Sequence, residues 1–207
     1  MLAGGFGTRL QGVVNDRPKP MAPISGRPFL EYQLDYLIQQ GIQSVTLCTG
    51  HLSSVIEDHF GHTYRSLSIN YSIEDQPLGT GGAIKKALTN LREEKVVVLN
   101  GDSYFGVDLS SMFQSHQSNN RPITVALKQM RDFDRYGTVV FNNSLVINQF
   151  NEKVATQSGW INGGAYIIDT SISIEFPKQD QFSFEAFMAS KASEQRLTAF
   201  LSDGYFI

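Results

Sequence analysis

Residues 96–102 read Val96-Val97-Val98-Leu99-Asn100-Gly101-Asp102, an apolar run that ends in an aspartate. A continuous apolar run of this kind is typical of a central parallel strand that is buried on both faces. Before it, segments with strand and helix spacing alternate: strands at 45–48 and 69–73, and helices at 28–40, 52–60 and 80–91. This alternation predicts βαβ units and a doubly wound parallel sheet.

The pattern changes in the second part of the chain. A helix at 108–116 and a strand at 123–129 are followed by turn-linked strands at 136–141, 145–150 and 160–168, a helix at 182–190 and a strand at 197–201. These strands predict an antiparallel extension of the sheet. No linker or repeat divides the chain, so we expect one domain over 1–207, with halves at about 1–130 and about 131–207. Both termini look truncated, because almost no chain precedes residue 4 and residues 204–207 read as an interrupted strand.

Composition and charge exclude several classes of protein. The 207 residues carry a formal net charge of −3, which argues against a broad nucleic-acid-binding surface. The single cysteine, Cys48, excludes an internal disulfide and a cysteine-based zinc site, and its apolar neighbours predict a buried side chain. The sequence has no signal peptide and no apolar run near the ~20 residues of a membrane span. We therefore expect a cytoplasmic protein that binds neither membranes nor nucleic acid.

Phosphate binding is predicted by the segment Leu2-Ala3-Gly4-Gly5-Phe6-Gly7-Thr8-Arg9-Leu10 and by Lys19, which stands between two prolines. The glycines leave backbone N–H groups open to a polyanion. Arg9 and Lys19 would neutralise phosphate charge as a bond breaks. The segment lacks the Gly-Lys-Ser/Thr of a Walker loop, and it lacks the third glycine and the acidic residue of a dinucleotide fingerprint. The pattern favours a nucleoside triphosphate site over a plain tight turn.

Two further segments place polar groups at the carboxyl edge of the sheet. The turn at 79–83, Gly-Thr-Gly-Gly-Ala, leads from a strand into a helix, where a flat base would lie against bare backbone. Glu74 precedes this turn, and a carboxylate pairs with two N–H groups of guanine but with only one of uracil or thymine. The alternative for Glu74 is a solvated carboxylate at a strand end. We interpret Asp102 as a Mg²⁺ ligand and not as a helix cap, because Asp108 is better placed to cap the next helix.

In the second half, Glu152-Lys153 follows a strand and Asn162-Gly163-Gly164 interrupts another. Lys153 would hold a monophosphate, and Glu152 and Asn162 would bind sugar hydroxyls. The alternatives are an ordinary surface pair and a β-bulge.

Taken in this order, the motifs resemble the sugar-1-phosphate nucleotidylyltransferase family. They lie at 2–10, 18–21, 78–83, 100–102, 152–153 and 162–164, and together they span nearly the whole chain. Residues 74–83 and 100–104 look most like the D-glycero-α-D-manno-heptose 1-phosphate guanylyltransferases within it. The resemblance implies a Rossmann-like three-layer α/β/α sandwich with a mostly parallel sheet. It also implies condensation of an NTP, here GTP, with a sugar 1-phosphate to give an NDP-sugar and pyrophosphate.

The resemblance implies a role for each matching position. Arg9, Lys19 and Asp102 are the catalytic residues, and Asp102 binds the cofactor Mg²⁺. The positions that bind the nucleotide are Leu2, Ala3, Gly4, Gly5, Gly7, Thr8, Glu74, Gly79 and Thr80. The positions that bind the sugar phosphate are Gly137, Glu152, Lys153, Asn162 and Gly163. Family members often form dimers or tetramers, so the resemblance leaves a homo-oligomer open.

The chain departs from the family pattern at both ends. Members usually have several apolar residues before the first glycine loop, and a second metal-binding aspartate shortly after the last strand found here. Mannose-1-phosphate guanylyltransferases and N-acetylmuramate-1-phosphate uridylyltransferases remain alternatives. A non-catalytic subunit that binds a nucleotide-sugar is a rival of another class. A glycosyltransferase is disfavoured because 102–104, Asp-Ser-Tyr, lacks the second acid of an Asp-x-Asp motif.

Overall fold

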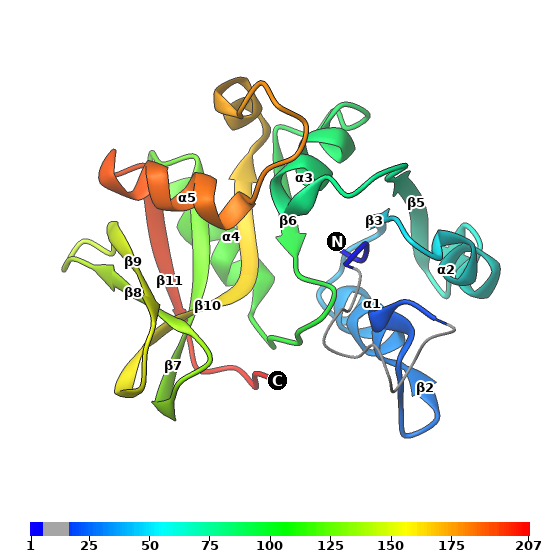
Figure 1. Cartoon of the computed structure of the whole chain (residues 1–207), viewed down its shortest axis with the longest axis horizontal. Helices are drawn as coiled ribbons and strands as arrows, with labels where there is room; N and C mark the ends of the chain where they lie inside the picture. Colours follow the sequence, from blue (N-terminus) through cyan, green and yellow to red (C-terminus); the bar gives the residue numbers. More distant parts are fainter. Residues whose placement is uncertain (6–16) are drawn as a thin grey trace.

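The computed structural model describes residues 1–5 and 17–207 (Figure 1). The predicted site positions Gly7, Thr8 and Arg9 lie outside the described residues. The first half contains η2 (Lys19–Met21), β1 (Pro23–Ile24), β2 (Arg27–Pro28), α1 (Phe29–Gln39), β3 (Ser44–Thr49), α2 (Ser53–Phe60), β4 (Thr63–Tyr64), β5 (Leu67–Ile73), α3 (Gly79–Leu88), β6 (Lys95–Leu99) and α4 (Leu109–Ser118). The second half contains β7 (Ile123–Phe133), β8 (Gly137–Phe141), β9 (Ile147–Lys153), β10 (Thr156–Asp169), η3 (Thr170–Glu175), α5 (Phe184–Ser193) and β11 (Leu197–Ser202).

Each helix and strand expected from the spacing is present, with bounds shifted by a few residues. The segment at 204–207 pairs antiparallel with residues 104–106 around the bridge between Phe206 and Phe105, but the pairing is too short to form a named strand. The short strands β1, β2 and β4 carry no strand pattern in the sequence. The capping expectation is confirmed, because the Asp108 side chain begins α4 and accepts a hydrogen bond from the Ser111 N–H at 3.0 Å.

Residues 1–3 join two groups of strands into one surface. Leu2 forms parallel bridges with Cys48, on β3, and with Asn100, directly after β6. The Leu2 N–H donates to the Leu99 carbonyl at 2.9 Å, and the Ala3 N–H donates to the Cys48 carbonyl at 2.8 Å. On one side of this short strand lies the order β3-β5-β4, with β3 and β5 parallel. On the other side β6 pairs antiparallel with β10, so the antiparallel extension begins at β6.

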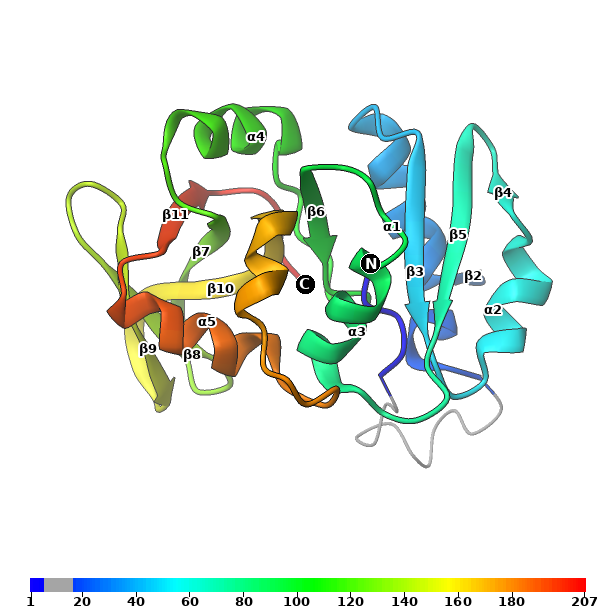
Figure 2. The same cartoon turned by 90° about the horizontal axis from the view of Figure 1, so that it is seen from above.

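Helices cover both faces of this surface, as expected for three layers (Figure 2). Side chains that alternate along β6 and β10 point to opposite faces. Leu99 and Ile167 pack in the cluster that contains α1 and α4 residues, whereas Val98 and Ile168 pack in the cluster that contains α3 and α5 residues. The apolar run at 96–99 is therefore buried from both sides, which explains why it shows no polar alternation.

Candidate active site

Three chain segments leave the sheet together at its carboxyl edge. Residues 1–3, β5 and β6 end there, and they lead into residues 4–5, 74–79 and 100–103. The Gly101 N–H donates to the Leu2 carbonyl at 2.8 Å, and a Cβ at Gly101 would collide with that carbonyl. Gly101 is thus required by the close passage of residues 1–3. The topology brings residues 1–3, at the start of the first glycine segment, beside the loop that carries Asp102.

Lys19 and Asp102 meet at this edge, although 83 positions separate them in the chain. The Lys19 Nζ donates to the Asp102 Oδ2 at 2.8 Å, and the two side chains are 37% and 52% exposed. Lys19 lies on the 3₁₀ turn η2, which begins after Pro18 and contains Pro20, so its backbone is held by restricted φ angles. An ammonium and a carboxylate therefore face each other while both remain open to solvent.

Glu74 lies against the first glycine segment. Its Oε2 accepts a hydrogen bond from the Leu78 N–H at 3.0 Å, which closes the turn before α3. A Cβ at Gly4 would stand 3.0 Å from its Oε1, so Gly4 leaves room for this carboxylate. Burial raises the pKa of the Glu74 carboxyl, although the Leu78 hydrogen bond and Lys86 act in the other direction. Glu74 is a half-buried acid, which differs from a freely solvated carboxylate at a strand end.

The glycines of the second glycine turn make contacts that the sequence analysis did not anticipate. A Cβ at Gly81 would collide with the Phe182 ring, and one at Gly82 with the Asp180 carbonyl. The Gly81 N–H donates to the Phe182 carbonyl at 2.9 Å, and the Phe182 N–H donates to the Leu78 carbonyl at 3.0 Å. Gly81 and Gly82 therefore admit the segment 180–182, whereas we expected the turn's bare backbone to face a flat base.

Thr80 is engaged by the beginning of α5. Its Oγ1 donates to the Glu185 Oε2 at 2.6 Å and accepts a hydrogen bond from the Phe184 N–H at 2.8 Å. Lys85 adds a second connection, since its Nζ donates to the carbonyls of Pro177 and Lys178 at 3.3 Å each. These contacts join both the beginning and the last turn of α3 to the second half of the chain. Sequence spacing carried no signal for them, because more than 90 positions separate the partners.

The positions expected to bind the sugar phosphate lie on β8, β9 and β10. Gly137 pairs with Lys153 across β8 and β9, and a Cβ at Gly137 would collide with the Asn151 carbonyl. Glu152 and Lys153 are exposed on β9. Within the part of the chain that the structure describes, neither side chain forms an ion pair or hydrogen bond.

Asn162 and Gly163 occupy an irregular part of β10, where the register with β7 shifts. The Asn162 Nδ2 donates to the Tyr166 hydroxyl at 2.9 Å, and its Oδ1 accepts from the Gly164 N–H at 2.9 Å. A Cβ at Gly163 would collide with the Phe105 ring. The backbone at this position is therefore irregular, as the β-bulge alternative predicts. The nitrogen and the oxygen of the Asn162 amide each already form one hydrogen bond.

A series of aromatic rings connects the Asp102 loop to the second half. The Phe105 and Phe206 ring centroids are 5.6 Å apart, and those of Phe206 and Tyr136 are 5.8 Å apart, both edge to face. Tyr136 directly precedes Gly137 on β8. The segment at 204–207 thus packs between the loop that carries Asp102 and the first residue expected to bind the sugar phosphate.

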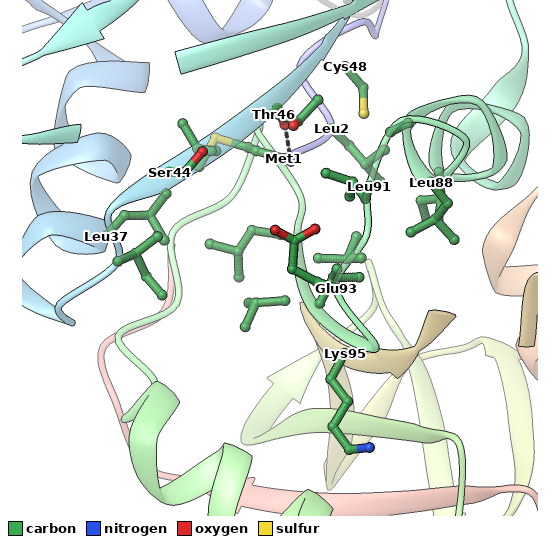
Figure 3. A pocket seen from close by; sticks show the side chains of 18 of the residues that line it. Met1, Leu2, Leu37, Ser44, Thr46, Cys48, Leu88, Leu91, Glu93 and Lys95 are labelled. Atoms are coloured by element: carbon green, nitrogen blue, oxygen red, sulfur yellow. Dashed lines mark hydrogen bonds between the residues drawn. The ribbon is translucent and has the colours of Figure 1, made fainter. Parts of the chain in front are cut away.

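A cavity of about 360 Å³ lies elsewhere, beside the N-terminus (Figure 3). Its lining is mainly apolar and comes from residues 1–2, from α3, and from β3 and β6 along most of their length. The Met1 ammonium donates to the Thr46 carbonyl at 2.8 Å, and burial lowers the pKa of this amino group. Cys48 also lines the cavity and is buried, as predicted, and burial raises the pKa of its thiol. Lys19 and Asp102, the predicted catalytic residues that the structure describes, do not line it.

Residues 1–205 match the model of the family described as "Nucleotidyl transferase". The chain belongs to the nucleotidyl transferase family. It is 49% identical over 208 residues to the D-glycero-alpha-D-manno-heptose 1-phosphate guanylyltransferase of Aneurinibacillus thermoaerophilus, covering 100% of this chain and 90% of that protein. It is 44% identical to the protein of the same name from Campylobacter jejuni, covering 100% of this chain and 91% of that one.

Two solved structures share the fold. HddC from Yersinia pseudotuberculosis, described as complexed with GMP-PN, superposes with a TM-score of 0.87 at 36% identity, covering 100% of this chain and 90% of that chain. A putative glucose-1-phosphate thymidylyltransferase from Bacillus anthracis gives a TM-score of 0.85 at 21% identity, covering 99% of this chain and 86% of that chain, and shares the fold alone. The three-layer α/β prediction is confirmed. Among the residues described, no helix is long and apolar enough to cross a membrane.

Proposed function

We propose that this nucleotidyl transferase condenses GTP with D-glycero-α-D-manno-heptose 1-phosphate to give GDP-heptose and pyrophosphate. The observation that carries the proposal is the match, over the whole of this chain, to two proteins named as guanylyltransferases of that specificity, at 49% and 44% identity. The mannose-1-phosphate guanylyltransferase of Mycobacterium tuberculosis is more distant, at 34% identity over 89% of this chain. The acid beside the first glycine segment, Glu74, is also of the type that pairs with the two N–H groups of guanine.

In the proposed reaction, a phosphate oxygen of the sugar 1-phosphate attacks the α-phosphorus of GTP. The new bond joins that oxygen to the α-phosphorus, and the bond from the α-phosphorus to the bridging oxygen breaks, so that pyrophosphate leaves. Lys19 would stabilise the negative charge that develops on the phosphates, together with Arg9 from the first glycine segment. Holding both substrates in line supplies much of the remaining acceleration, so no covalent enzyme intermediate is required.

Asp102 fits a Mg²⁺ ion that is shared with the nucleotide. Its carboxylate is half-exposed and its only side-chain partner among the described residues is Lys19. The described residues contain no cluster of three or more acidic, histidine or cysteine side chains that would hold a metal by themselves. Mg²⁺ in nucleotide sites is usually held by one or two carboxylates and the substrate phosphates, so a single carboxylate fits. When bound, the ion would neutralise phosphate charge beside Asp102.

The sugar phosphate is assigned to the exposed face of β9 and its neighbours. Lys153 carries an ammonium with no ion-pair partner in residues 1–5 and 17–207, so it is available to a phosphate. Glu152 lies next to it, available to sugar hydroxyls. Asn162 is held by its bonds to Tyr166 and Gly164, and it would offer the sugar its second N–H or the second lone pair of its oxygen. The homo-oligomer and the cytoplasmic location stay predictions.

A substrate screen tests the proposal. GTP, UTP, CTP and dTTP are each combined with heptose, mannose and N-acetylmuramate 1-phosphates and Mg²⁺, and pyrophosphate release is measured. We expect the highest kcat/KM with GTP and the heptose 1-phosphate. A preference for mannose 1-phosphate or for UTP would replace this assignment with one of the two alternatives. Tight binding of a nucleotide-sugar with no pyrophosphate release in any combination would favour a non-catalytic subunit.

Glu74→Gln tests whether the Glu74 carboxylate recognises the guanine base. The amide can still accept the Leu78 N–H, but it offers guanine one acceptor in place of two. We expect a higher KM for GTP, by about 10-fold or more for the loss of a hydrogen bond to a charged acceptor, and a reduced preference for GTP over UTP. In the wild type the KM for GTP should rise as the pH falls through the raised pKa of Glu74, and this dependence should disappear in the variant. An unchanged KM at every pH would contradict the role of Glu74.

The same variant should gain stability at neutral pH, although it binds GTP more weakly. Because the folded-state pKa of Glu74 is raised, the folded protein holds this proton more tightly than the unfolded chain does. Ionising Glu74 therefore lowers the free energy of unfolding as the pH rises from the unfolded pKa, about 4.3, through the folded value. We expect Glu74→Gln to be more stable than the wild type at neutral pH, with a smaller difference below about pH 4.3 in urea unfolding.

A further inference from the structure

Gln33 is a buried polar residue on a helix face that is otherwise apolar. It is 3% exposed and lies on α1 between Leu30, Leu34 and Leu37, which are buried as well. Its Nε2 donates to the Asn100 carbonyl at 3.0 Å and to the Ser103 carbonyl at 2.5 Å. These two carbonyls stand on either side of Gly101 and Asp102. One side chain thus holds both ends of the loop that presents the catalytic carboxylate.

Packing alone does not explain a glutamine at this position. The Gln33 Oε1 is buried and has no donor among the described residues, and the same is true of the Asn100 Oδ1. Both residues line a cavity of about 10 Å³ beneath the loop. A buried polar atom without a partner destabilises the folded state. The position therefore tolerates the cost of one unpaired oxygen while both N–H groups of the amide are used on the Asp102 loop. An apolar side chain would remove that oxygen but would take the donor away from both carbonyls, which costs stability as well.

We propose that Gln33 is a positioning residue, which fixes residues 100–103 so that the Asp102 carboxylate is oriented toward its cation. The inference rests on the proposed function, in which that cation is Mg²⁺ with the nucleotide. Groups that hold a metal ligand in place typically change metal affinity or activity by ~10–100-fold when they are removed. Gln33 is buried and bonds the two ends of the Asp102 loop, so its effect is expected on metal use and not on the recognition of base or sugar.

Tyr36 provides a matched control on the same helix. Its hydroxyl donates to the Val107 carbonyl at 2.5 Å, so it also joins α1 to the segment after β6 through a buried hydrogen bond. Val107, however, lies beyond Phe105 and does not flank Asp102. Tyr36→Phe removes a contact of the same kind without freeing either end of the Asp102 loop. Gln39→Met, at an exposed position of α1, controls for the glutamine-to-methionine change itself.

The test compares Gln33→Met with these controls in the full chain. Mg²⁺ is titrated in the pyrophosphate-release assay, and Mn²⁺ binding in the presence of GTP is followed by electron paramagnetic resonance. We expect Gln33→Met to raise the Mg²⁺ concentration needed for half-maximal activity and to weaken Mn²⁺ binding, each by about 10-fold or more. The KM values for GTP and for the sugar phosphate should stay within about twofold of the wild type. Tyr36→Phe should lower the unfolding midpoint as Gln33→Met does, but leave metal use within about twofold. Gln39→Met should change neither.

The outcomes separate this inference from the proposed function. If the wild type neither releases pyrophosphate nor binds Mn²⁺ with GTP, the proposed function fails. If the wild type does both and Gln33→Met has the wild-type metal dependence, or if Tyr36→Phe shifts it equally, the positioning role is overturned. Gln33→Leu, which also lacks the two donors, takes the place of Gln33→Met if the methionine variant does not fold.

Discussion

Replacing Lys19 by methionine is expected to lower kcat by ~10²–10³-fold, which corresponds to about 3–4 kcal/mol of transition-state stabilisation. The Lys19 ammonium is held on a proline-flanked turn within 2.8 Å of the Asp102 carboxylate. A methionine keeps most of the length of the side chain but removes the charge that would stabilise the departing phosphates. Steady-state pyrophosphate release with saturating GTP and heptose 1-phosphate measures this loss.

The same variant should bind a divalent cation more tightly when no nucleotide is present. In the structure Lys19 already pairs with Asp102, so a metal ion must compete with the ammonium for that carboxylate. A solvent-exposed ion pair contributes up to about 1 kcal/mol, so its removal should strengthen Mn²⁺ binding by up to about fivefold. A loss of turnover combined with stronger metal binding is a signature that general unfolding would not produce.

A matched control is Lys178→Met, which changes an exposed lysine whose side chain forms no ion pair or hydrogen bond within residues 1–5 and 17–207. Its kcat and Mn²⁺ affinity should equal those of the wild type. If Lys19→Met retained wild-type turnover, the assignment of Lys19 to the phosphates would be wrong. If turnover fell while the Mn²⁺ affinity also fell, the competition between Lys19 and the metal would be wrong.

Much of the fold was predictable because it depends on local patterns. The run at 96–99 is apolar throughout since β6 is covered on both faces, and the helical spacing at 28–40 and 80–91 reflects one buried side of α1 and α3. The antiparallel placement of β10 between β6 and β7 was not predictable, because the residues of a strand do not indicate which other strands it pairs with. Residues 204–207 form no named strand, because their antiparallel pairing with residues 104–106 is limited to one bridge and the hydrogen bonds beside it.

The candidate site was predictable where chemistry is visible in residue types. Lys19 and Asp102 were identified from a proline-flanked lysine and an acid at a strand end, and the structure brings them together. Gln33 was not identified, because one polar residue on a helical face gives no signal of which carbonyls it meets. The reason for Gly81 and Gly82 was also missed, since the segment that packs on them, 180–182, lies about 100 positions later.

Asp102→Asn is expected to reduce kcat/KM by at least ~10²-fold, because a metal ion that stabilises phosphate charge supplies several kcal/mol and the amide is a poor ligand for Mg²⁺. Asparagine has nearly the same shape, and the carboxylate it replaces is half-exposed, so the free energy of unfolding should change by less than ~1 kcal/mol. Raising the Mg²⁺ concentration should recover part of the activity. Asp58→Asn, at an exposed position on α2, should leave both quantities unchanged.

The double variant Lys19→Met with Asp102→Asn decides whether the two residues act as a unit. If each contributes independently, the two losses multiply, giving at least ~10⁴-fold. If the metal and the ammonium stabilise the same phosphate charge, the activity of the double variant should be little lower than that of the less active single variant. The reason is that residues that act together lose most of their effect when the first of them is removed. The ion pair between them and their common position at one sheet edge favour the second result. Wild-type activity in Asp102→Asn at low Mg²⁺ would exclude Asp102 as the metal ligand.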